Sequence, residues 1–541
     1  MVQMSKSSYE ARRKILEKIL SGEIPDRNSL ERIKKGISKD FKLSKVPSNA
    51  EILKTAKGDE REEVLPPLQR KPVRSISGVT VITVMPRPYP CPKDEPCIYC
   101  PGGPDSNTPQ SYTGEEPASA RAKEANFDPE KQILARKKQL RAIGHKVDKV
   151  ELIVFGGTFL AQPRDYQEEF MHSCIDAISN NRTPDLETAK KRAETAETRT
   201  IGITFETRPD YSKSPHVDQM LRLGGTRVEM GVQTTYEDIY ELTNREHNLQ
   251  DVVEATKTAK DSGLAVVYHM MPGLPGSSPE RDLNSFEEIF ENPSFRPDML
   301  KIYPCLVIKG TKLYDMWKSG NFDPLEGDEA VELIAEMKKR VPRWVRIQRI
   351  QRDIPSDLIE AGVWKGNLRS IVQDRLEEEG ERCECIRCRE AGHRKLKDNV
   401  NPRVEEAELT TEVYEASDGK EVFISYEDMK KDILFGHLRL RIPSRDFYRK
   451  EIDEKTAIVR MLYVFGKVVP VGNGSSEHTW QHLGLGKKML KKSERIASEK
   501  YDAKRIAVLS GIGSREYYRQ FNYKLQGCYM VKDLRKDLFI P

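Results

Sequence analysis

The stretch Cys91-Pro-Lys-Asp-Glu-Pro-Cys97-Ile-Tyr-Cys100-Pro-Gly-Gly103 carries three cysteines in a short loop that its prolines make stiff. An apolar run rich in β-branched residues, 79–84, precedes it and is typical of a strand. Three thiolates on one loop can hold three irons of a cubane cluster and leave the fourth iron open for a ligand. Zinc and chance are the competing interpretations, but zinc normally takes four protein ligands and no histidine lies nearby.

Apolar strand-like segments alternate with helical segments from about residue 76 onward. The predicted strands are 79–85, 149–155, 199–205, 227–232, 264–270 and 299–306, with helices between them such as 129–142 and 166–178. Six consecutive βα units predict an α/β fold in which a parallel sheet, spanning residues 76–375, rolls into an incomplete barrel. In such barrels the chemistry lies where the strands end.

Glycine-rich or polar motifs follow these strands. They are Phe155-Gly156-Gly157-Thr158, Glu206-Thr-Arg208-Pro-Asp, Gly231-Val-Gln233-Thr and His269-Met-Met-Pro-Gly. Each alone is an ordinary turn, whereas their joint position at strand ends, together with the cysteine loop, indicates an active site. Lys149 and Lys301, which enter the second and sixth strands, are strand-edge lysines on sequence grounds alone.

Length and composition limit the class of protein. At 541 residues the chain is long enough for three to four domains. It is 37% apolar and 32% charged, and neither a run of 18 apolar residues nor the apolar core of a signal peptide is present, so we expect no membrane span and a cytoplasmic location. Six of the nine cysteines form two tight triplets, which favours two metal sites in a reducing compartment over disulfides.

Basic residues are concentrated at the amino terminus. Residues 1–75 contain 18 Lys and Arg against 11 Asp and Glu, a surplus of 18 − 11 = +7. This favours a nucleic-acid-binding region and a solvated helical tail about equally. Helices are predicted over 8–21 and 28–37, the second with Ser29 as N-cap, and 57–75 is predicted to be a linker.

A second basic stretch lies in residues 330–376, where several arginines and lysines are interleaved with Trp344, Ile347 and Ile350. Aromatic and cationic side chains in alternation suit RNA binding. An amphipathic barrel element with a solvated basic face explains the same pattern equally well.

The second cysteine triplet follows in a linker, residues 376–402. Cys383-x-Cys385-x2-Cys388-x4-His393 supplies three thiolates and one imidazole at short spacing. This set predicts a closed, structural zinc site, with a second iron–sulfur cluster as the alternative.

The pattern of predicted strands and helix in residues 403–541 is typical of a separate mixed α/β domain. Strands are predicted over 421–425, 433–442, 456–469, 505–510 and 523–532, and a helix over 485–500. The sequence Gln481-His482-Leu483-Gly484-Leu485-Gly486-Lys487 opens that helix, where free backbone N–H groups favour an anion. Tyr517 and Tyr518 follow the next strand.

These motifs resemble known families. The cysteine loop is similar to that of the radical S-adenosylmethionine (SAM) superfamily, although its C-x5-C-x2-C spacing departs from the usual C-x3-C-x2-C. The longer spacing, with Pro101-Gly-Gly-Pro-Asp-Ser and Gln110-Ser-Tyr-Thr-Gly-Glu-Glu-Pro, resembles one branch, the Elongator catalytic subunits with their archaeal and bacterial relatives. Residues 403–541 are similar to the GNAT acetyltransferases.

The resemblance implies cofactors and a site for each. It implies a [4Fe-4S] cluster on Cys91, Cys97 and Cys100, with SAM beside Tyr99. The SAM-binding residues that we expect are Gly156, Gly157, Thr158, Glu206 and Gln233. The acetyl-CoA-binding residues that we expect are Lys149 near the radical site, Met461, Leu462, Tyr463 and Val464 along the thioester arm, Gln481, His482, Gly484, Leu485, Gly486 and Lys487 at the pyrophosphate, and Tyr517 and Tyr518, with Tyr518 close to the thioester sulfur. Lys149 and Tyr518 are the expected catalytic residues.

The implied activity is that of a tRNA uridine(34) acetyltransferase of the acyltransferase class. A SAM-derived 5′-deoxyadenosyl radical would take hydrogen from the acetyl methyl group, whose carbon would then add to C5 of the uridine, and thioester hydrolysis would leave a carboxymethyl group. The expected partners are tRNA, bound through its anticodon stem-loop, acetyl-CoA and an electron donor, with a homodimer as an option. The alternative is a protein lysine acetyltransferase with a structural iron–sulfur cluster.

Overall fold

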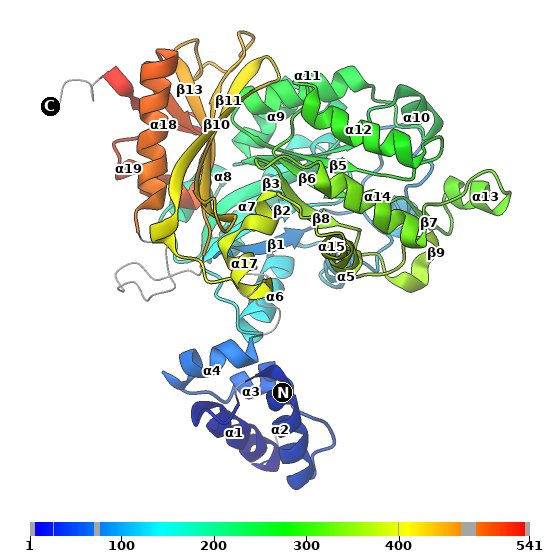
Figure 1. Ribbon diagram of the computed structural model, residues 1–541, viewed down its shortest axis with the longest axis vertical. Coiled ribbons are helices and arrows are strands. Elements are labelled where there is room, and N and C mark those ends of the chain that lie inside the picture. Colours follow the sequence, from blue (N-terminus) through cyan, green and yellow to red (C-terminus); the bar gives the residue numbers. More distant parts are fainter. Residues whose placement is uncertain (1–5, 25, 70–75, 399, 467–482, 536–541) are drawn as a thin grey trace.

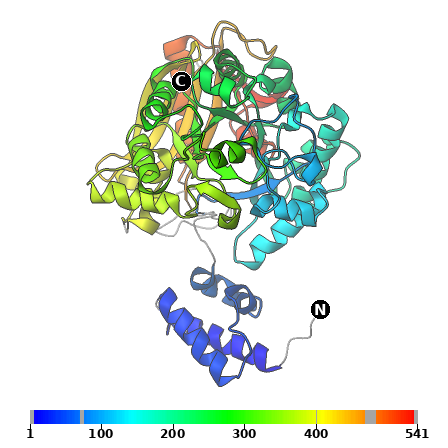
Figure 2. The same ribbon diagram turned by 90° about the vertical axis from the view of Figure 1, so that its right-hand side faces the viewer.

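The computed structural model describes residues 6–24, 26–69, 76–398, 400–466 and 483–535 (Figure 1). Gln481 and His482 lie outside these ranges. Two sheets with their helices form the body of the molecule, and a small helical unit projects from it (Figures 1 and 2).

The projecting unit consists of four helices with a core of their own. Its helices are α1 (Lys6–Leu20), α2 (Arg27–Asp40), α3 (Asn49–Leu53) and α4 (Glu60–Leu68). Ile15, Leu30 and Ile52 are buried between them, and Arg13 pairs with Glu60 at 2.7 Å. The segment predicted to be a linker therefore contains a packed helix, which was not expected because of its two prolines.

The start of α2 also differs from the prediction. Asp26, rather than Ser29, is the N-cap, and its carboxylate accepts a hydrogen bond from the Ser29 backbone N–H at 2.8 Å. A carboxylate at this position satisfies a free N–H and interacts favourably with the helix dipole, so the helix begins earlier than Ser29.

The first sheet of the body is the predicted incomplete barrel. Its strands, all parallel, lie in the order β1 (Thr80–Val84), β2 (Lys149–Val154), β3 (Arg199–Thr207), β4 (Arg227–Gln233), β5 (Ala265–Met270), β6 (Met299–Ile302) and β8 (Arg346–Ile350). The helices between these strands are α5 (Pro117–Glu124), α6 (Pro129–Ala142), α7 (Arg164–Ser179), α8 (Leu186–Ala193), α9 (Ser214–Arg222), α10 (Glu237–Leu242), α11 (Leu249–Asp261), α12 (Pro279–Glu291), α13 (Lys312–Lys318) and α14 (Gly327–Lys339). The strands are short and mostly buried on both faces, as expected for a covered parallel sheet.

Strand β8 is the seventh of the sheet and lies in the second basic stretch. It pairs with β6, with Leu300 opposite Ile347. Of the two interpretations of that stretch, the structure therefore supports the barrel element. The predicted strand 299–306 is split, because β6 ends at Ile302 and β7 (Leu306–Ile308) pairs separately with β9 (Ile359–Gly362).

The linker consists of α15 (Leu368–Glu378), α16 (Ile386–Arg389) and α17 (Ala391–Lys397). The second sheet follows, with its strands in the order β10 (Glu408–Ala416), β11 (Gly419–Asp428), β12 (Ile433–Ile442), β13 (Thr456–Val464), β14 (Arg505–Val508), β16 (Tyr529–Asp533) and β15 (Lys524–Gln526). Its helices are α18 (Leu485–Tyr501) and α19 (Arg515–Arg519). The predicted strand 523–532 is in fact a hairpin, because Gly527 turns the chain with a φ of +56°.

Buried charges join the two sheets. Arg460 of β13 donates to both carboxylate oxygens of Asp298, which precedes β6, at 2.6 and 2.8 Å. It also lies 2.9 Å from Glu421 of β11. All three side chains have no exposed surface. Arg460 is the cation that joins the two carboxylates, while Arg439 lies 3.3 Å from Asp298 and Arg441 3.2 Å from Glu421. This buried group of charges disfavours separation of the two halves.

Among the described helices, none has the length and apolarity that a membrane crossing requires.

Candidate active site

The cysteine loop follows β1, and hydrogen-bond donors surround its sulfur atoms. Cys97 is 8% exposed. Its Sγ accepts from Arg245 Nη1 at 3.5 Å and from Lys93 Nζ at 3.7 Å. Cys100 Sγ accepts from Gln110 Nε2 at 3.2 Å. Donors directed at sulfur stabilise the thiolate, which is the form that binds iron.

The charges around the loop favour one thiolate in particular. Burial raises the pKa of Cys97, but Arg245 and Lys93 outweigh it and hold that pKa below the ordinary value for a thiol. Burial and the negative charge of Cys97 raise the pKa of Cys100. Binding of a metal cluster would therefore release the Cys100 proton, as is usual for a metal-ligating thiol.

The distances between the sulfur atoms help to distinguish a zinc site from an iron–sulfur cluster site. Three thiolates on one zinc ion lie about 3.8 Å apart, as tetrahedral bonds of about 2.3 Å require. Among the described residues, Cys91, Cys97 and Cys100 do not form such a group within 4.8 Å. A wider spacing suits a cubane, in which each cysteine binds a different iron. The described cysteines of the loop therefore lack the compact arrangement of a zinc site, while the hydrogen-bond donors at Cys97 and Cys100 suit the thiolates that a cluster binds.

The Gly156–Gly157 turn at the end of β2 is packed against the loop that follows the cysteines. Gly156 has a φ of +119°, and a Cβ added there would lie 3.0 Å from Pro109. Gly157 has a φ of +77°, and its added Cβ would lie 3.1 Å from Gln110. Only glycine suits both the backbone and the space. The turn therefore brings backbone close to the loop that follows the cysteines, and Thr158 continues it.

A buried network of charges crosses the barrel beside this turn. His269 of β5 lies 3.2 Å from Glu229 and 3.6 Å from Glu206. Glu206 accepts from the Tyr112 hydroxyl at 3.0 Å, and Lys301 pairs with Glu229. Burial raises the pKa of Glu229, but Lys301 and His269 outweigh it and bring that pKa to about 2. The network holds the predicted residue Glu206 in place at the strand end.

Sequence reasoning missed Glu229 and Tyr112. Glu229 stands inside the apolar strand β4, between Val228 and Met230. An acid within an otherwise buried strand was the available signal, because such a group needs a partner. Tyr112 lies in the loop after the cysteines, and nothing in its local sequence indicates its contact with Glu206.

The predicted residue Gln233 ends β4 in an unusual conformation. Its φ is +74°, and its buried Oε1 has no hydrogen-bond partner among the described residues. A buried amide oxygen without a partner is costly unless a ligand or water satisfies it. Gln233 therefore has the features of a ligand-binding residue at the same strand-end edge as Glu206.

Lys149 lies at the other end of the barrel. It is the first residue of β2, opposite Arg199 in the register, whereas the Gly-Gly turn follows the last residue of that strand. Burial and the charge of Arg199 lower the pKa of Lys149. The structure does not bring it to the cysteine loop, and its predicted role in catalysis stays a prediction.

A cavity of about 510 Å³ occupies the inside of the barrel and reaches the second sheet. Phe155 and Lys301, beside the Gly-Gly turn, line one part of it, and His437, Tyr463 and Phe465 of the second sheet line another. Its volume is in the range of pockets that hold small molecules and cofactors. The cavity connects the strand ends of the barrel with the second domain.

The second cysteine triplet forms a compact group. The sulfur atoms of Cys383, Cys385 and Cys388 lie within 4.8 Å of one another and are largely buried. His393 is not part of this group. It is buried, its Nε2 lies 4.0 Å from Glu390, and it lines the interior cavity. The thiolates thus fit the predicted zinc ion, while the predicted imidazole ligand lies outside the group in this structure.

The predicted acyl-donor residues lie around the end of β13. The register of β13 with β14 stops at Val459 opposite Val508. The backbone of Met461, Leu462 and Tyr463 therefore has no partner strand on that side among the described strands, and Val464 follows them at the end of β13. A strand edge left open in this way is available to an extended ligand.

The glycines of α18 are arranged as the sequence predicts. Gly484 is the N-cap with a φ of +76°, and no side chain of a described residue caps the helix. A Cβ on Gly486 would lie 2.7 Å from the Tyr517 hydroxyl. Tyr517 and Tyr518 pack edge to face at 5.3 Å, and Tyr518 is buried. Leu485 is buried as well, and Lys487 lies 5.9 Å from the Phe521 ring.

Comparison with known proteins agrees with these observations. Residues 90–289 match the radical SAM superfamily, residues 297–378 the radical SAM C-terminal domain and residues 8–76 the ELP3 N-terminal domain. The chain is 50% identical to a tRNA uridine(34) acetyltransferase of Methanocaldococcus infernus, over 96% of this chain and 98% of that protein. It is 45% identical to human Elongator complex protein 3, over 94% and 93% of the two chains.

The solved structure of the archaeal Methanocaldococcus infernus Elp3 with an N-terminal deletion aligns with a TM-score of 0.75 and 47% identity, covering 85% of this chain and all of that chain. Because the sequence similarity extends over nearly the full length of these relatives, the chain belongs to the family of Elongator complex protein 3 and the archaeal tRNA uridine(34) acetyltransferases.

Proposed function

We propose that this protein attaches a carboxymethyl group to C5 of the wobble uridine, position 34, of tRNA. Acetyl-CoA would supply the two carbons, and SAM would supply the 5′-deoxyadenosyl radical that activates the acetyl methyl group. Thioester hydrolysis would complete the product. The archaeal relatives carry the name tRNA uridine(34) acetyltransferase, and the carboxymethyl chemistry is our extension of that activity.

The observation that carries this proposal is the interior cavity. It is lined both by Phe155 and Lys301, beside the Gly156–Gly157 turn, and by Tyr463 of the second sheet. An acyl group held at the end of β13 could reach the radical site inside the protein. A chain that only acetylated lysine side chains would have no use for such a connection.

We assign the following roles to the residues of this chain. Cys91, Cys97 and Cys100 would hold a [4Fe-4S] cluster, which supplies the electron for reductive cleavage of SAM. The Gly156–Gly157 backbone and Gln233 would bind the polar groups of SAM. The buried network around Glu229 would keep the strand ends rigid, so that reacting groups meet in one geometry.

The acyl donor would bind the second domain. The N-terminal N–H groups of α18, from Gly484 onward, would receive the pyrophosphate of acetyl-CoA. The open edge of β13 would hold the pantetheine arm, and Tyr518 would lie near the sulfur. Gln481 and His482 are expected to take part, on the resemblance of their motif.

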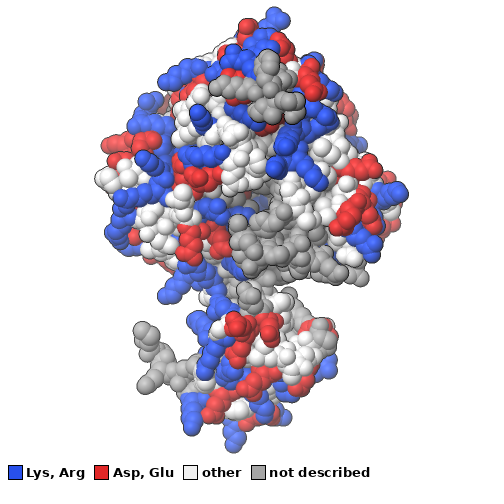
Figure 3. Space-filling model, turned by 90° about the vertical axis from the view of Figure 1, so that its left-hand side faces the viewer, with Lys and Arg blue, Asp and Glu red and all other residues white. Residues whose placement is uncertain are grey.

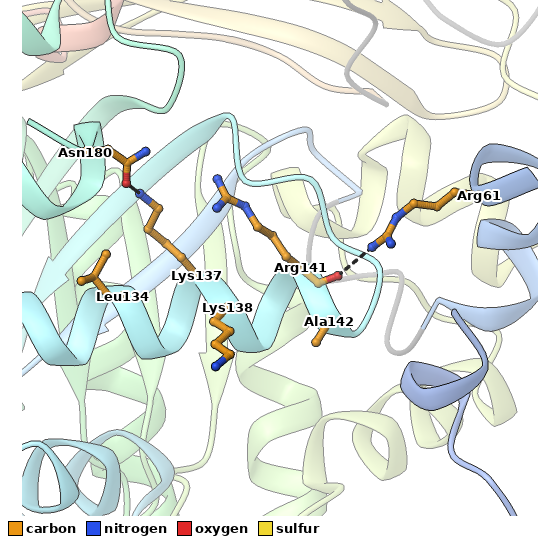
Figure 4. A pocket seen from close by; sticks show the side chains of 7 residues that line it. All are labelled: Arg61, Leu134, Lys137, Lys138, Arg141, Ala142 and Asn180. Carbon is orange, nitrogen blue, oxygen red and sulfur yellow. Dashed lines mark hydrogen bonds between the residues drawn. The ribbon is translucent and has the colours of Figure 1, made fainter. Parts of the chain in front are cut away.

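The tRNA would contact the projecting unit and the neighbouring part of the barrel. Figure 3 shows lysines and arginines on the surface of both parts. At the junction, a pocket of about 310 Å³ lies between Arg61 and α6 (Figure 4). Lys138 and Arg141 are exposed there, whereas Lys137 is occupied by the carbonyl groups at the end of α7. Exposed cations of this kind suit phosphates.

The compact triplet Cys383, Cys385 and Cys388 would hold structural zinc in the linker, with His393 as the predicted fourth ligand. We also propose, on the basis of the sequence, that an electron donor reduces the cluster. The same basis suggests a cytoplasmic location and a homodimer.

Replacement of Cys97 by serine tests the proposal against its rival. We expect C97S to retain acetyl-CoA binding, measured by calorimetry, and to lose all formation of modified uridine under anaerobic conditions with SAM and a reductant. A lysine acetyltransferase with a structural cluster would instead keep its transfer activity towards peptides in C97S. Such activity, together with unmodified tRNA from the wild-type protein, would refute the proposal.

A further inference from the structure

One histidine in the wall of the interior cavity is buried without any hydrogen bond. His437 of β12 is 2% exposed, and neither of its ring nitrogens has a partner among the described residues. It packs against the rings of Phe423 at 5.3 Å and Tyr463 at 5.6 Å. Buried polar groups are nearly always paired, so an unpaired imidazole on a cavity wall indicates a ligand.

Two further donors line the same cavity. Arg346 of β8 donates through Nη2 to Glu390 at 2.9 Å, while its buried Nη1 has no partner among the described residues. The Tyr463 hydroxyl accepts from Arg227 Nη2 at 3.0 Å, which leaves its own proton available. The Phe465 ring packs near both groups, with its centroid 5.6 Å from the His437 ring and 5.6 Å from the Arg346 guanidinium.

The charge state of His437 makes it a donor as well. Burial and the nearby charges of Arg439 and Arg346 hold its pKa well below the ordinary value, so the imidazole is neutral. A neutral imidazole carries one N–H, and neutral histidine can polarise a carbonyl group in this way. The cavity wall thus offers imidazole, guanidinium and phenol donors, and an oxygen acceptor would satisfy them.

We propose that His437, together with Arg346 and Tyr463, binds the acyl oxygen of the thioester donor at the acetyltransferase end of the interior cavity. The inference deepens the proposed function and rests on it, because acetyl-CoA brings that oxygen to the end of β13. The three donors hold the carbonyl, orient the acetyl group towards the barrel and polarise the thioester for its later hydrolysis. The carboxylate that thioester hydrolysis leaves on the product presents the same kind of oxygen, and acetate is its simplest analogue.

Calorimetry with two probes tests the site in the full-length protein. Acetonyl-CoA, in which a ketone replaces the thioester, carries the acyl oxygen and is not hydrolysed, whereas CoA lacks that oxygen. We expect wild-type protein to bind acetonyl-CoA more tightly than CoA. H437F keeps an aromatic ring in the stack but removes the donor, so it should weaken acetonyl-CoA binding about tenfold and leave CoA binding unchanged.

Two controls separate a binding role from a structural one. H437Q retains a donor and should recover part of the preference for acetonyl-CoA, and Y501F, on the outer helix α18, should behave as wild type. The infrared carbonyl band of bound acetonyl-CoA, labelled with 13C at the ketone, should shift to lower frequency in wild type and lose that shift in H437F.

Acetate distinguishes the two sources of the oxygen. Competition of sodium acetate with acetonyl-CoA in wild type but not in H437F would assign the site to the product carboxylate as well. Lack of competition would assign it to the thioester carbonyl alone. The inference is overturned if H437F binds acetonyl-CoA as wild type does, or if it loses affinity for both probes equally. Failure of wild-type protein to bind either probe would instead count against the proposed function.

Discussion

At the scale of single residues, the site is held by side chains and backbone positions that tolerate little change. Gly156 has space only for a hydrogen atom beside Pro109, and Glu229 is kept ionised by Lys301 and His269. In both cases the geometry of the strand ends depends on one position. We therefore expect substitutions at these positions to change SAM binding and the free energy of unfolding, which separate measurements can distinguish.

Replacement of Gly156 by alanine should destabilise the protein by about 1–3 kcal/mol, because it adds backbone strain and a contact with Pro109. We also expect loss of SAM binding, measured by equilibrium dialysis. G310A is a matched control, since Gly310 has a φ of +83° but nothing within 4 Å of its added Cβ. Equal behaviour of the two variants would show that the contact at Gly156 has no effect.

Replacement of Lys301 by methionine should leave the Glu229 carboxylate without its main partner. In the wild type, the pKa of Glu229 is lowered to about 2, against about 4.3 in an unfolded chain. Its contribution to stability is therefore complete above about pH 4.3 and disappears as the pH falls towards 2. We expect K301M to lower the melting temperature by several degrees at pH 7.

The pH dependence provides the check on that variant. The deficit of K301M should shrink as the pH is lowered from 7 towards 4, because the unpaired Glu229 then takes up a proton. The double variant K301M/E229Q should show little of this dependence. A deficit that stays constant with pH would contradict the assignment of the effect to Glu229.

At the scale of elements, two strands show where a sequence pattern misleads. Strand β8 places Arg346 and Gln348 on the cavity wall and Ile347 against the core. Its polar residues therefore face the cavity. In the sequence, the same alternation of basic and apolar residues resembles that of a basic face exposed to solvent. Strand β10 is an edge strand with much of its surface exposed, so its polar sequence carries no strand signal.

The motifs that we propose to bind the cofactors could be recognised in the sequence for a physical reason. Three of these motifs are local: the loop of Cys91, Cys97 and Cys100, the Gly-Gly turn, and the glycines of α18. The residues that form each motif are close together in the sequence, so the motif can be recognised without the fold. The group of His437, Arg346 and Tyr463 combines β12, β8 and β13. No sequence pattern indicates such a group, because its members meet only in the folded protein.

The metal bound by the cysteine triplet of the linker can be measured directly. We expect about one zinc per chain by mass spectrometry of the purified protein, in addition to the cluster iron. C385S should lose the zinc and retain the iron, because the two triplets are separate sites, and C174S, at a buried single cysteine, should lose neither. Iron in place of zinc at this site would contradict the assignment.

At the scale of the whole molecule, the two domains of the body act as one unit. Arg460, Asp298 and Glu421 are buried at their interface, and the cavity passes between them. Burial raises the pKa of Asp298, but Arg460 and Lys260 outweigh it and keep the carboxyl ionised. Transfer of an acyl group through the interior is therefore more consistent with this structure than a large movement of one domain.

Replacement of Arg460 by methionine should weaken the contact between the two domains by up to about 3–5 kcal/mol, because two buried carboxylates lose the cation that they share. Limited proteolysis should then release fragments that correspond to the barrel and the second domain. R505M, which removes a partly exposed partner of Asp453, is the control and should remain intact. Equal resistance of R460M and R505M would show that the buried charges do not hold the domains together.

The central claim is that the acetyl carbon of acetyl-CoA reaches uridine through radical chemistry in one protein. The most direct measurement is nucleoside mass spectrometry of tRNA after anaerobic reaction with SAM, a reductant and acetyl-CoA labelled with 13C in the methyl carbon and with deuterium. We predict 5-carboxymethyluridine that carries the 13C label, and deuterium in the released 5′-deoxyadenosine. Unmodified uridine, or a modified uridine without the label, would contradict the account.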